Sequence, residues 1–175
     1  MAYNFKPELS FIESQTAATS ASIVFTSGIS TNFENYVVKL RNVVAAAGAD
    51  DLKVDFSVNG GSTYLSSGSY AVQGATLTTI SRNGANGGPN YIALTCSTSS
   101  GNCLNGELFL NNLQDASNHI AYFSGVQVNN SGNISTMVSG IRNYDNTASV
   151  NCIKFSFSTG NITSGTFILY GVNEP

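Results

Sequence analysis

The feature that most constrains the fold is the pattern of apolar residues over residues 150–172, VNCIKFSFSTGNITSGTFILYGV. Ile153, Phe155 and Phe157 alternate with polar or small residues, which is the two-residue period of a strand with one buried face. A stretch rich in Gly, Asn, Ser and Thr follows, and the closing FILYGV is apolar on both faces of an extended chain. The segment therefore predicts a half-buried strand, a loop over residues 158–165 and a fully buried strand over residues 167–172.

The same alternation recurs along the rest of the chain. Its clearest instance is LKVDFSV at residues 52–58, which ends in Asn59-Gly60-Gly61, residues that tolerate positive φ and suit a tight turn. Residues 83–90, NGANGGPN, are predicted to be irregular, because three glycines and a proline oppose regular structure. The other predicted strands are residues 22–26, 36–44, 70–80 (interrupted at Gly74), 91–96, 104–110, 119–128 and 134–141.

This pattern predicts an all-β fold with almost no helix. About eight to ten strands joined by turn clusters at near-regular spacing are typical of a sandwich or barrel. We expect a single-domain, jelly-roll-like antiparallel β-sandwich over residues 20–175, preceded by an N-terminal arm or attachment segment over residues 1–19. An immunoglobulin-like sandwich is the second choice, disfavoured because the chain has no tryptophan for its core.

The composition indicates how the exposed faces are made. Charged residues supply 10% of the chain, against roughly 25% in ordinary soluble domains, while hydrophobic residues supply 42%. Because Ser, Thr and Asn supply roughly a third of the residues, the surface must be mostly hydroxyl and amide. Such a surface avoids the cost of desolvating ions and suits packing against other subunits or neutral sugars. The alternative is simply a soluble all-β protein rich in turns.

Several classes of function are disfavoured by charge and hydropathy. The net charge is −3 and the seven basic residues are scattered, so neutralising a nucleic-acid backbone is not the expected task. No apolar run approaches the roughly 20 residues needed to cross a bilayer. The N-terminus lacks the basic and apolar regions of a secretory signal. We expect a protein that folds in a cytosol and leaves it inside something larger.

Catalytic and metal sites are not predicted. His119 is the only histidine, with Asp115 as its nearest acid in sequence, and no G-x-S-x-G elbow is present. Asp50, Asp51 and Asp55 could contribute oxygens to a calcium site, yet nothing resembles a dedicated calcium loop, and a solvated acidic pair is the preferred interpretation. We therefore expect no enzyme, no metal and no cofactor. A small hydrolase that uses His119 is the least favoured alternative.

The three cysteines, Cys96, Cys103 and Cys152, are an odd number in a chain without a signal peptide, which argues against a disulfide framework. Cys96 and Cys103 flank a turn and could bridge if oxidised. Buried thiols are the preferred interpretation.

Tyrosines near predicted loops are the remaining candidates for recognition. They are Tyr64, Tyr70, Tyr91, Tyr122 and Tyr144. A tyrosine ring among amides and hydroxyls suits a sugar, because the ring stacks on a pyranose while the amides bind its hydroxyl groups. The residues predicted to contact a glycan or a protein partner are Tyr64, Tyr70, Asn143, Tyr144 and Asp145. Alternatively, these rings cap strand ends or fill a subunit interface.

Three segments, in order along the chain, resemble a family of small phage virion proteins described as tail, fibre or capsid-surface components. They are FIESQTAATSASIVFTSG with NYVVKLRNV (residues 11–28 and 35–43), residues 52–70 with SVNGGSTY, and the ending IKFSFSTGNITSGTFILYG with its GTFxLYG-type strand. The resemblance covers roughly half of the chain. It implies a β-sandwich that assembles as a homo-oligomer on a virion and carries no catalytic residues.

The expected function is that of a non-enzymatic bacteriophage virion structural protein on the particle surface, as a capsid decoration or a tail- or fibre-associated component. Its expected partners are its own copies, as a homotrimer or another homo-oligomer, and capsid or tail proteins. Synthesis in the host bacterial cytoplasm and residence in the virion follow from this assignment. The alternative is a receptor- or glycan-binding module of a tail or head fibre, which adds a host surface glycan as partner.

Overall fold

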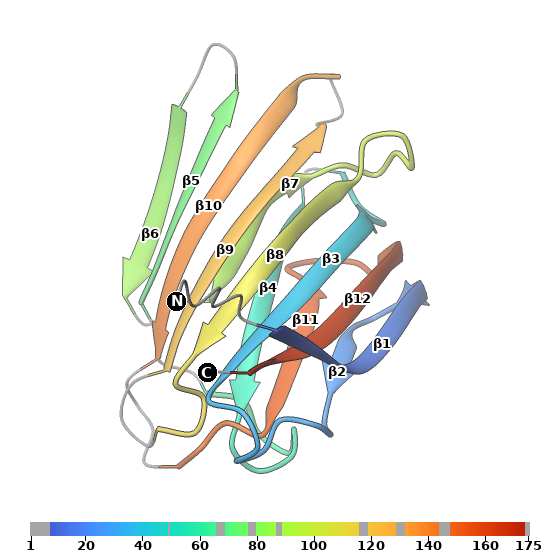
Figure 1. Cartoon of the computed structure of the whole chain (residues 1–175). Helices are drawn as coiled ribbons and strands as arrows, with labels where there is room; N and C mark the ends of the chain where they lie inside the picture. The colour runs from blue at the N-terminus through green and yellow to red at the C-terminus, as the bar shows by residue number, and fades with distance from the viewer. Residues whose placement is uncertain are drawn as a thin grey trace, which may run out of the picture.

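The structure is a computed structural model that describes residues 8–48, 50–65, 69–76, 80–86, 89–115, 119–128, 132–143 and 148–173. These residues form twelve β-strands and no helix, and the strands make two antiparallel sheets packed face to face (Figure 1). The predicted all-β sandwich is therefore confirmed. No helix in the described residues is long and apolar enough to span a bilayer.

The two sheets differ in size. The large sheet has the strand order β1 (Glu8–Ser20), β12 (Ile162–Asn173), β3 (Asn35–Ala45), β8 (Leu104–Asn111), β9 (His119–Val128), β10 (Ile134–Asn143), β5 (Ser69–Thr76) and β6 (Ile80–Asn86). The small sheet has the order β2 (Ile23–Phe25), β11 (Cys152–Phe157), β4 (Asp50–Ser57) and β7 (Tyr91–Cys96).

The connections between these strands are those of a jelly roll. When the hairpins β5–β6 and β9–β10 are set aside, each sheet keeps four strands, in the orders β1-β12-β3-β8 and β2-β11-β4-β7. Along these eight strands the chain crosses from one sheet to the other after β1, β2, β3, β7, β8 and β11, which is the eight-stranded double Greek key. The two hairpins only widen the large sheet. They account for twelve strands where the sequence pattern predicted about eight to ten.

The core lies between the sheets and is built by the predicted alternation. Ile153, Phe155 and Phe157 of β11 all point inward and are buried. The Phe155 ring lies 5.1 Å from the ring of Phe167 on β12, so the two closing strands meet across the sandwich. Phe25 of β2 meets Phe155 edge-on at 6.4 Å. Burying each such side chain contributes roughly 1.5–3 kcal/mol.

The inner surface of the large sheet needs glycine at two neighbouring positions. Gly106 of β8 and Gly125 of β9 are directly paired, and the ring of Phe123 lies over both. A Cβ atom added at Gly106 or Gly125 would lie 2.6 Å or 2.5 Å from the Cζ atom of that ring. The missing side chains therefore make room for a large aromatic residue from the same face.

The segment expected to be an N-terminal arm belongs in part to the sandwich. Residues 8–19, which the sequence placed before the domain, lie in β1, the edge strand that pairs with β12 from Glu8 to Ser20. Gln15 also donates a hydrogen bond of 2.7 Å to the carbonyl oxygen of Val24, which ties this edge to the small sheet. The apolar pattern of an edge strand is weak because most of its side chains remain wet, and the sequence therefore gave little sign of it.

Two local boundaries also differ from prediction. Residues 70–80 were expected to form one strand and residues 83–90 an irregular loop, whereas the chain folds back into a β5–β6 hairpin with Ser69 opposite Asn86. Gly84 is accommodated in β6 because this strand lies at the edge of the sheet. Strand β12 begins at Ile162, so the last loop is shorter than the predicted residues 158–165.

Candidate functional site

The most unusual surface of the molecule is the outer face of the large sheet. In an antiparallel sheet with one face in water, outward side chains are normally polar. Here the outer face carries all the exposed large hydrophobic side chains among those whose burial the structure describes, which leaves out β5 and β6. They are Leu9 and Phe11 on β1, Phe109 on β8, Ile120, Tyr122 and Val126 on β9, and Ile134 and Val138 on β10. We call this set the apolar face.

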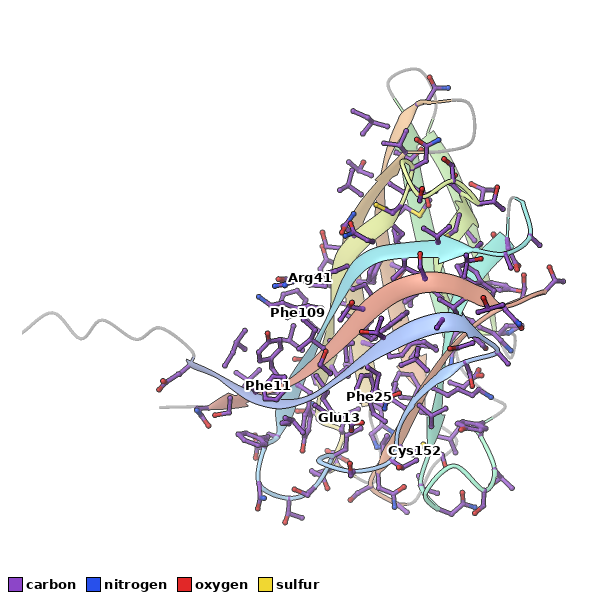
Figure 2. The ribbon with its side chains drawn as sticks, turned by 90° about the vertical axis from the view of Figure 1, so that its right-hand side faces the viewer. Phe11, Glu13, Phe25, Arg41, Phe109 and Cys152 are labelled. Carbon is purple, nitrogen blue, oxygen red and sulfur yellow. The ribbon has the colours of Figure 1, made fainter. Side chains whose placement is uncertain are left out.

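An almost continuous row of aromatic residues crosses the apolar face. Strand register places Phe11, Tyr170, Val37, Phe109 and Tyr122 as successive neighbours on five adjacent strands. The rings of Phe11 and Tyr170 lie 6.1 Å apart, and those of Phe109 and Tyr122 lie 6.2 Å apart. At about 4.8 Å between strands, the row spans on the order of 20 Å. Figure 2 shows Phe11 and Phe109 on this side of the sheet.

The charges on this face are few and partly neutralise one another. Lys39 of β3 and Glu107 of β8 are neighbours in register and form an ion pair of 3.3 Å. The Lys39 ammonium also lies 5.5 Å from the centre of the Tyr170 ring. Arg41, on the same side in Figure 2, is exposed. A paired cation and anion cost less to cover with another protein than two isolated charges.

The extent of the apolar face is comparable with a protein interface. Its eight side chains are between 37% and 65% exposed. At roughly 150–250 Å² for each large side chain, they present on the order of 600 Å². That area reaches the upper end of the largest apolar patch on a typical monomer, about 300–600 Å², and approaches the roughly 800 Å² that each partner contributes to a standard interface.

The outer face of the small sheet has the opposite character and contains the predicted site residue Tyr64. Asp55 pairs with Lys154 at 3.1 Å and with Lys53 at 3.7 Å. The ammonium of Lys154 lies 3.6 Å from the centre of the Tyr64 ring, so a cation covers one side of the ring that was expected to stack on a sugar. Burial, helped by the nearby thiol of Cys152, raises the pKa of Tyr64 to about 12.

The loop that carries Tyr64 is shaped by glycine, as the sequence predicted. Gly60 and Gly61 have φ of 69° and 87°, and the hydroxyl of Ser57 accepts a hydrogen bond of 3.0 Å from the Gly61 nitrogen. A Cβ atom added at Gly61 would lie 3.1 Å from the hydroxyl oxygen of Tyr64. The turn therefore places Tyr64 against the small sheet.

The other predicted site residues are not gathered around Tyr64. Tyr70 lies in β5 of the large sheet, with its backbone opposite Ile141 of β10. Asn143 is the last residue of β10, opposite His119. Tyr144 and Asp145 lie outside the described residues. The structure thus assigns Tyr64 to one sheet and the strands of Tyr70 and Asn143 to the other.

The residues considered for catalysis or metal binding have structural surroundings. His119 points into the sandwich and is 2% exposed, and burial lowers its pKa. Buried Asp50 accepts hydrogen bonds from the Ser158 hydroxyl and the Thr159 nitrogen, which anchors the last loop. The described part of the chain holds no group of three or more His, Cys, Asp or Glu side chains placed to share a metal ion.

All three thiols are free. Cys96 and Cys152 are buried, as the preferred interpretation stated, whereas Cys103 is half-buried and donates to the side-chain oxygen of Asn42 at 3.2 Å. Burial raises the pKa of Cys96 to about 12, so this thiol stays protonated at neutral pH.

Comparison of the chain with protein-family models, with curated proteins and with solved structures finds no match. The fold and the surface therefore define the class: a jelly-roll β-sandwich whose large sheet exposes an apolar outer face.

Of the eight residues of the apolar face, only Tyr122 was a candidate for recognition from the sequence, because it is a tyrosine near a predicted loop. A signal was present in HIAYFSGVQV, where Ile120, Tyr122 and Val126 occupy one parity and Ala121 and Phe123 the other. A strand that is apolar on both parities needs cover on both faces.

Proposed function

We propose that this protein is a non-enzymatic structural component of a bacteriophage virion, exposed on the particle surface as a capsid decoration or as a tail- or fibre-associated protein. It is made in the cytoplasm of the host bacterium and acts through protein–protein contacts. Its partners are its own copies, as a homotrimer or another homo-oligomer, and capsid or tail proteins. The observation that carries the proposal is the apolar face, whose exposed area is at the upper end of what typical monomers expose and whose exposure to water is unfavourable.

A second copy of the chain is the partner that best fits the apolar face. Every copy carries the same face, so a closed symmetric assembly covers all of them with one type of contact. The exposed area of the apolar face approaches the roughly 800 Å² that each partner contributes to a standard interface. Lys39 and Glu107 satisfy each other within one protomer at 3.3 Å, so a neighbour need not supply a compensating charge.

The assignment to a virion has separate support. The three segments of the chain that resemble small phage virion proteins favour this particle over other assemblies. The low content of charged residues, 10%, suits a surface that is packed against neighbouring subunits.

The oligomeric state tests the contact itself. Light scattering on the purified chain should give a homo-oligomer, and the double variant Phe109→Ser/Tyr122→Ser should shift it toward monomer, because two of the exposed rings of the apolar face are lost. The matched control is Val24→Ser, an outward residue of β2 in the small sheet, which should leave the oligomer intact. A parent chain that is monomeric at high concentration would contradict self-association.

The proposed role in the virion is tested on phage particles. Phage particles lacking the gene should lose one protein band and show altered stability or tail morphology in negative-stain images. The double variant should be incorporated poorly, whereas Val24→Ser should be incorporated normally. Particles of unchanged composition and stability would overturn the assignment to the virion.

A further inference from the structure

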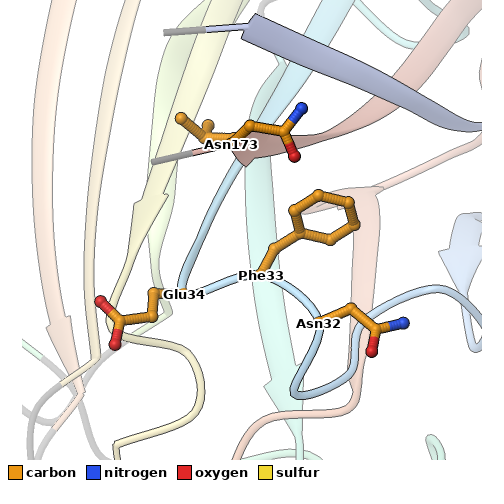
Figure 3. Close-up of a pocket in the computed structure, with 5 residues that line it drawn as sticks. Asn32, Phe33, Glu34 and Asn173 are labelled. Atoms are coloured by element: carbon orange, nitrogen blue, oxygen red, sulfur yellow. The ribbon is translucent and has the colours of Figure 1, made fainter. Parts of the chain in front are cut away.

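A polar hollow lies at one end of the sandwich, where the loop between β2 and β3 meets the end of β12. Its volume is about 350 Å³, and it is lined by Asn32, Phe33, Glu34, Val172 and Asn173 (Figure 3). Figure 3 shows Asn32, Phe33 and Glu34 following one another along the loop, with Asn173 across from them at the end of β12. None of these residues belongs to the apolar face.

A second hollow adjoins the first. It has a volume of about 280 Å³ and is lined by Glu34, Asn112, Gln114 and Asp115, the last three from the connection that follows β8. Glu34 lines both hollows, so the two share this residue. Together they form a groove, the rim groove, whose combined volume matches that of small-ligand sites, roughly 300–1,000 Å³.

The aromatic member of the rim groove is held in place. The Phe33 ring lies over Gly171, where an added Cβ atom would come within 2.4–2.6 Å of three ring atoms. It also meets the Tyr36 ring edge-on at 5.9 Å. Tyr36 is in turn fixed, because its hydroxyl donates to the Ser30 carbonyl oxygen at 2.6 Å. A ring fixed in this way is a preorganised platform that loses little entropy when a ligand stacks on it.

The polar members supply both acceptors and donors. Asn173 uses its Nδ2 atom to donate to Ser10 at 3.0 Å, which leaves its Oδ1 atom as an acceptor for a ligand. Gln114 lines the second hollow, while its Nε2 atom is buried and has no hydrogen-bond partner among the described residues. Asn32 and Glu34 are exposed on the loop.

We propose that the rim groove binds a neutral saccharide, with Phe33 stacked on a pyranose face and the amides and the Glu34 carboxylate bound to its hydroxyl groups. Amide and carboxylate groups around one aromatic ring match a ligand that is rich in hydroxyls and has an apolar ring face. The carboxylates of Glu34 and Asp115 repel an anionic sugar, and no Lys or Arg is among the described lining residues. These residues differ from those predicted from the sequence to contact a glycan or a protein partner, which were Tyr64, Tyr70, Asn143, Tyr144 and Asp145.

The test uses the full chain on an array of neutral oligosaccharides printed beside their sialylated and sulfated counterparts, followed by calorimetric titration of the strongest binder. A neutral oligosaccharide should be retained in preference to its charged forms. Glu34→Ala should weaken its binding by roughly tenfold or more, because a charge-assisted hydrogen bond is lost. Phe33→Leu, which keeps an apolar side chain over Gly171 but removes the flat ring, should also weaken it.

The control carboxylate is Glu13, which lines neither hollow and accepts hydrogen bonds from Gln15 and Ser27. Glu13→Ala should bind the saccharide as the parent does. Retention of no neutral oligosaccharide, preference for the anionic forms, or unchanged affinity in Glu34→Ala would each overturn the proposal. Light scattering keeps this result separate from self-association, because Glu34→Ala should keep the parent oligomer while Phe109→Ser/Tyr122→Ser should keep the saccharide affinity.

Discussion

The outer faces of the two sheets are unlike, although their inner faces are alike. Both inner faces contribute side chains to one buried hydrophobic core. Outside, the small sheet carries Lys53, Asp55 and Lys154 in one ionic network, whereas the large sheet carries eight exposed hydrophobic side chains and one ion pair. The need for a core explains both inner faces, but it explains neither outer face. An outer face reflects what covers it, and we propose that this is water on the small sheet and a neighbouring protein on the large one.

The largest expected effect is a loss of stability on substituting a side chain of the inner face of the large sheet, in contrast to its exposed neighbour on the outer face. Phe123 and Tyr122 are consecutive residues of β9, one buried and one 43% exposed. Phe123→Ala should lower the free energy of unfolding by about 3–5 kcal/mol, because it leaves a cavity over Gly106 and Gly125. Urea denaturation at fixed protein concentration measures this loss. A cost below about 1 kcal/mol would show that the ring is not part of a packed core.

Tyr122→Ser should instead leave the stability of the protomer almost unchanged and weaken self-association. The protomer should keep its stability to within about 0.5 kcal/mol, because an exposed side chain loses few contacts. Self-association should weaken by roughly tenfold, since an aromatic side chain near the centre of an interface typically contributes more than about 1 kcal/mol to binding. Sedimentation equilibrium over a range of concentrations measures both oligomer and monomer. An unchanged association constant would mean that the apolar face is not the contact.

Much of the fold could be predicted because the alternation of apolar and polar residues along a strand depends only on which face of the strand packs against the core. In β4 the sequence LKVDFS alternates without exception, and the structure buries Leu52, Val54 and Phe56. The strand at residues 119–128 was also placed correctly. Edge elements were harder to predict. Strand β1 buries only Ala17 fully, so it has no clear period, and the β5–β6 hairpin is marked by glycines that elsewhere indicate loops.

The candidate surface could not be predicted in the same way, because it depends on which strands become neighbours. Phe11 and Phe109 are almost a hundred residues apart in sequence, and only the order β1-β12-β3-β8 brings them into one row. The rim groove likewise joins Phe33, in the loop between β2 and β3, to Asn173 at the end of β12. Tyr64 fitted a composition rule for sugar sites, but its ring is covered by Lys154, a contact that the local sequence does not contain.

A smaller effect, confined to acid pH, tests the interior of the large sheet beside the apolar face. Burial lowers the pKa of His119 below its ordinary value of 6.5, against an opposing contribution from Asp115. Below pH 6.5 the unfolded chain therefore binds a proton more readily than the folded one, and stability should fall as the pH drops toward the folded-state pKa. His119→Leu should lose this part of the acid dependence. Denaturation midpoints between pH 7 and pH 5 measure it, and parallel curves for parent and variant would refute it.

The smallest expected effects are the losses of stability when an ion pair is removed from one or the other outer face. Asp55 forms ion pairs with two lysines, and its side chain is 16% exposed. Asp55→Asn should therefore lower the free energy of unfolding by about 1 kcal/mol. Glu107 forms an ion pair with one lysine, and its side chain is 44% exposed. In a dilute, monomeric sample Glu107→Gln should therefore lower the free energy of unfolding by only about 0.3 kcal/mol. Added salt should weaken both effects while water covers both faces. In the assembled state the order should reverse, because covering the large sheet would leave Lys39 buried without its partner, whereas the small sheet stays wet. Costs that stay the same at every protein concentration would show that both faces remain in water.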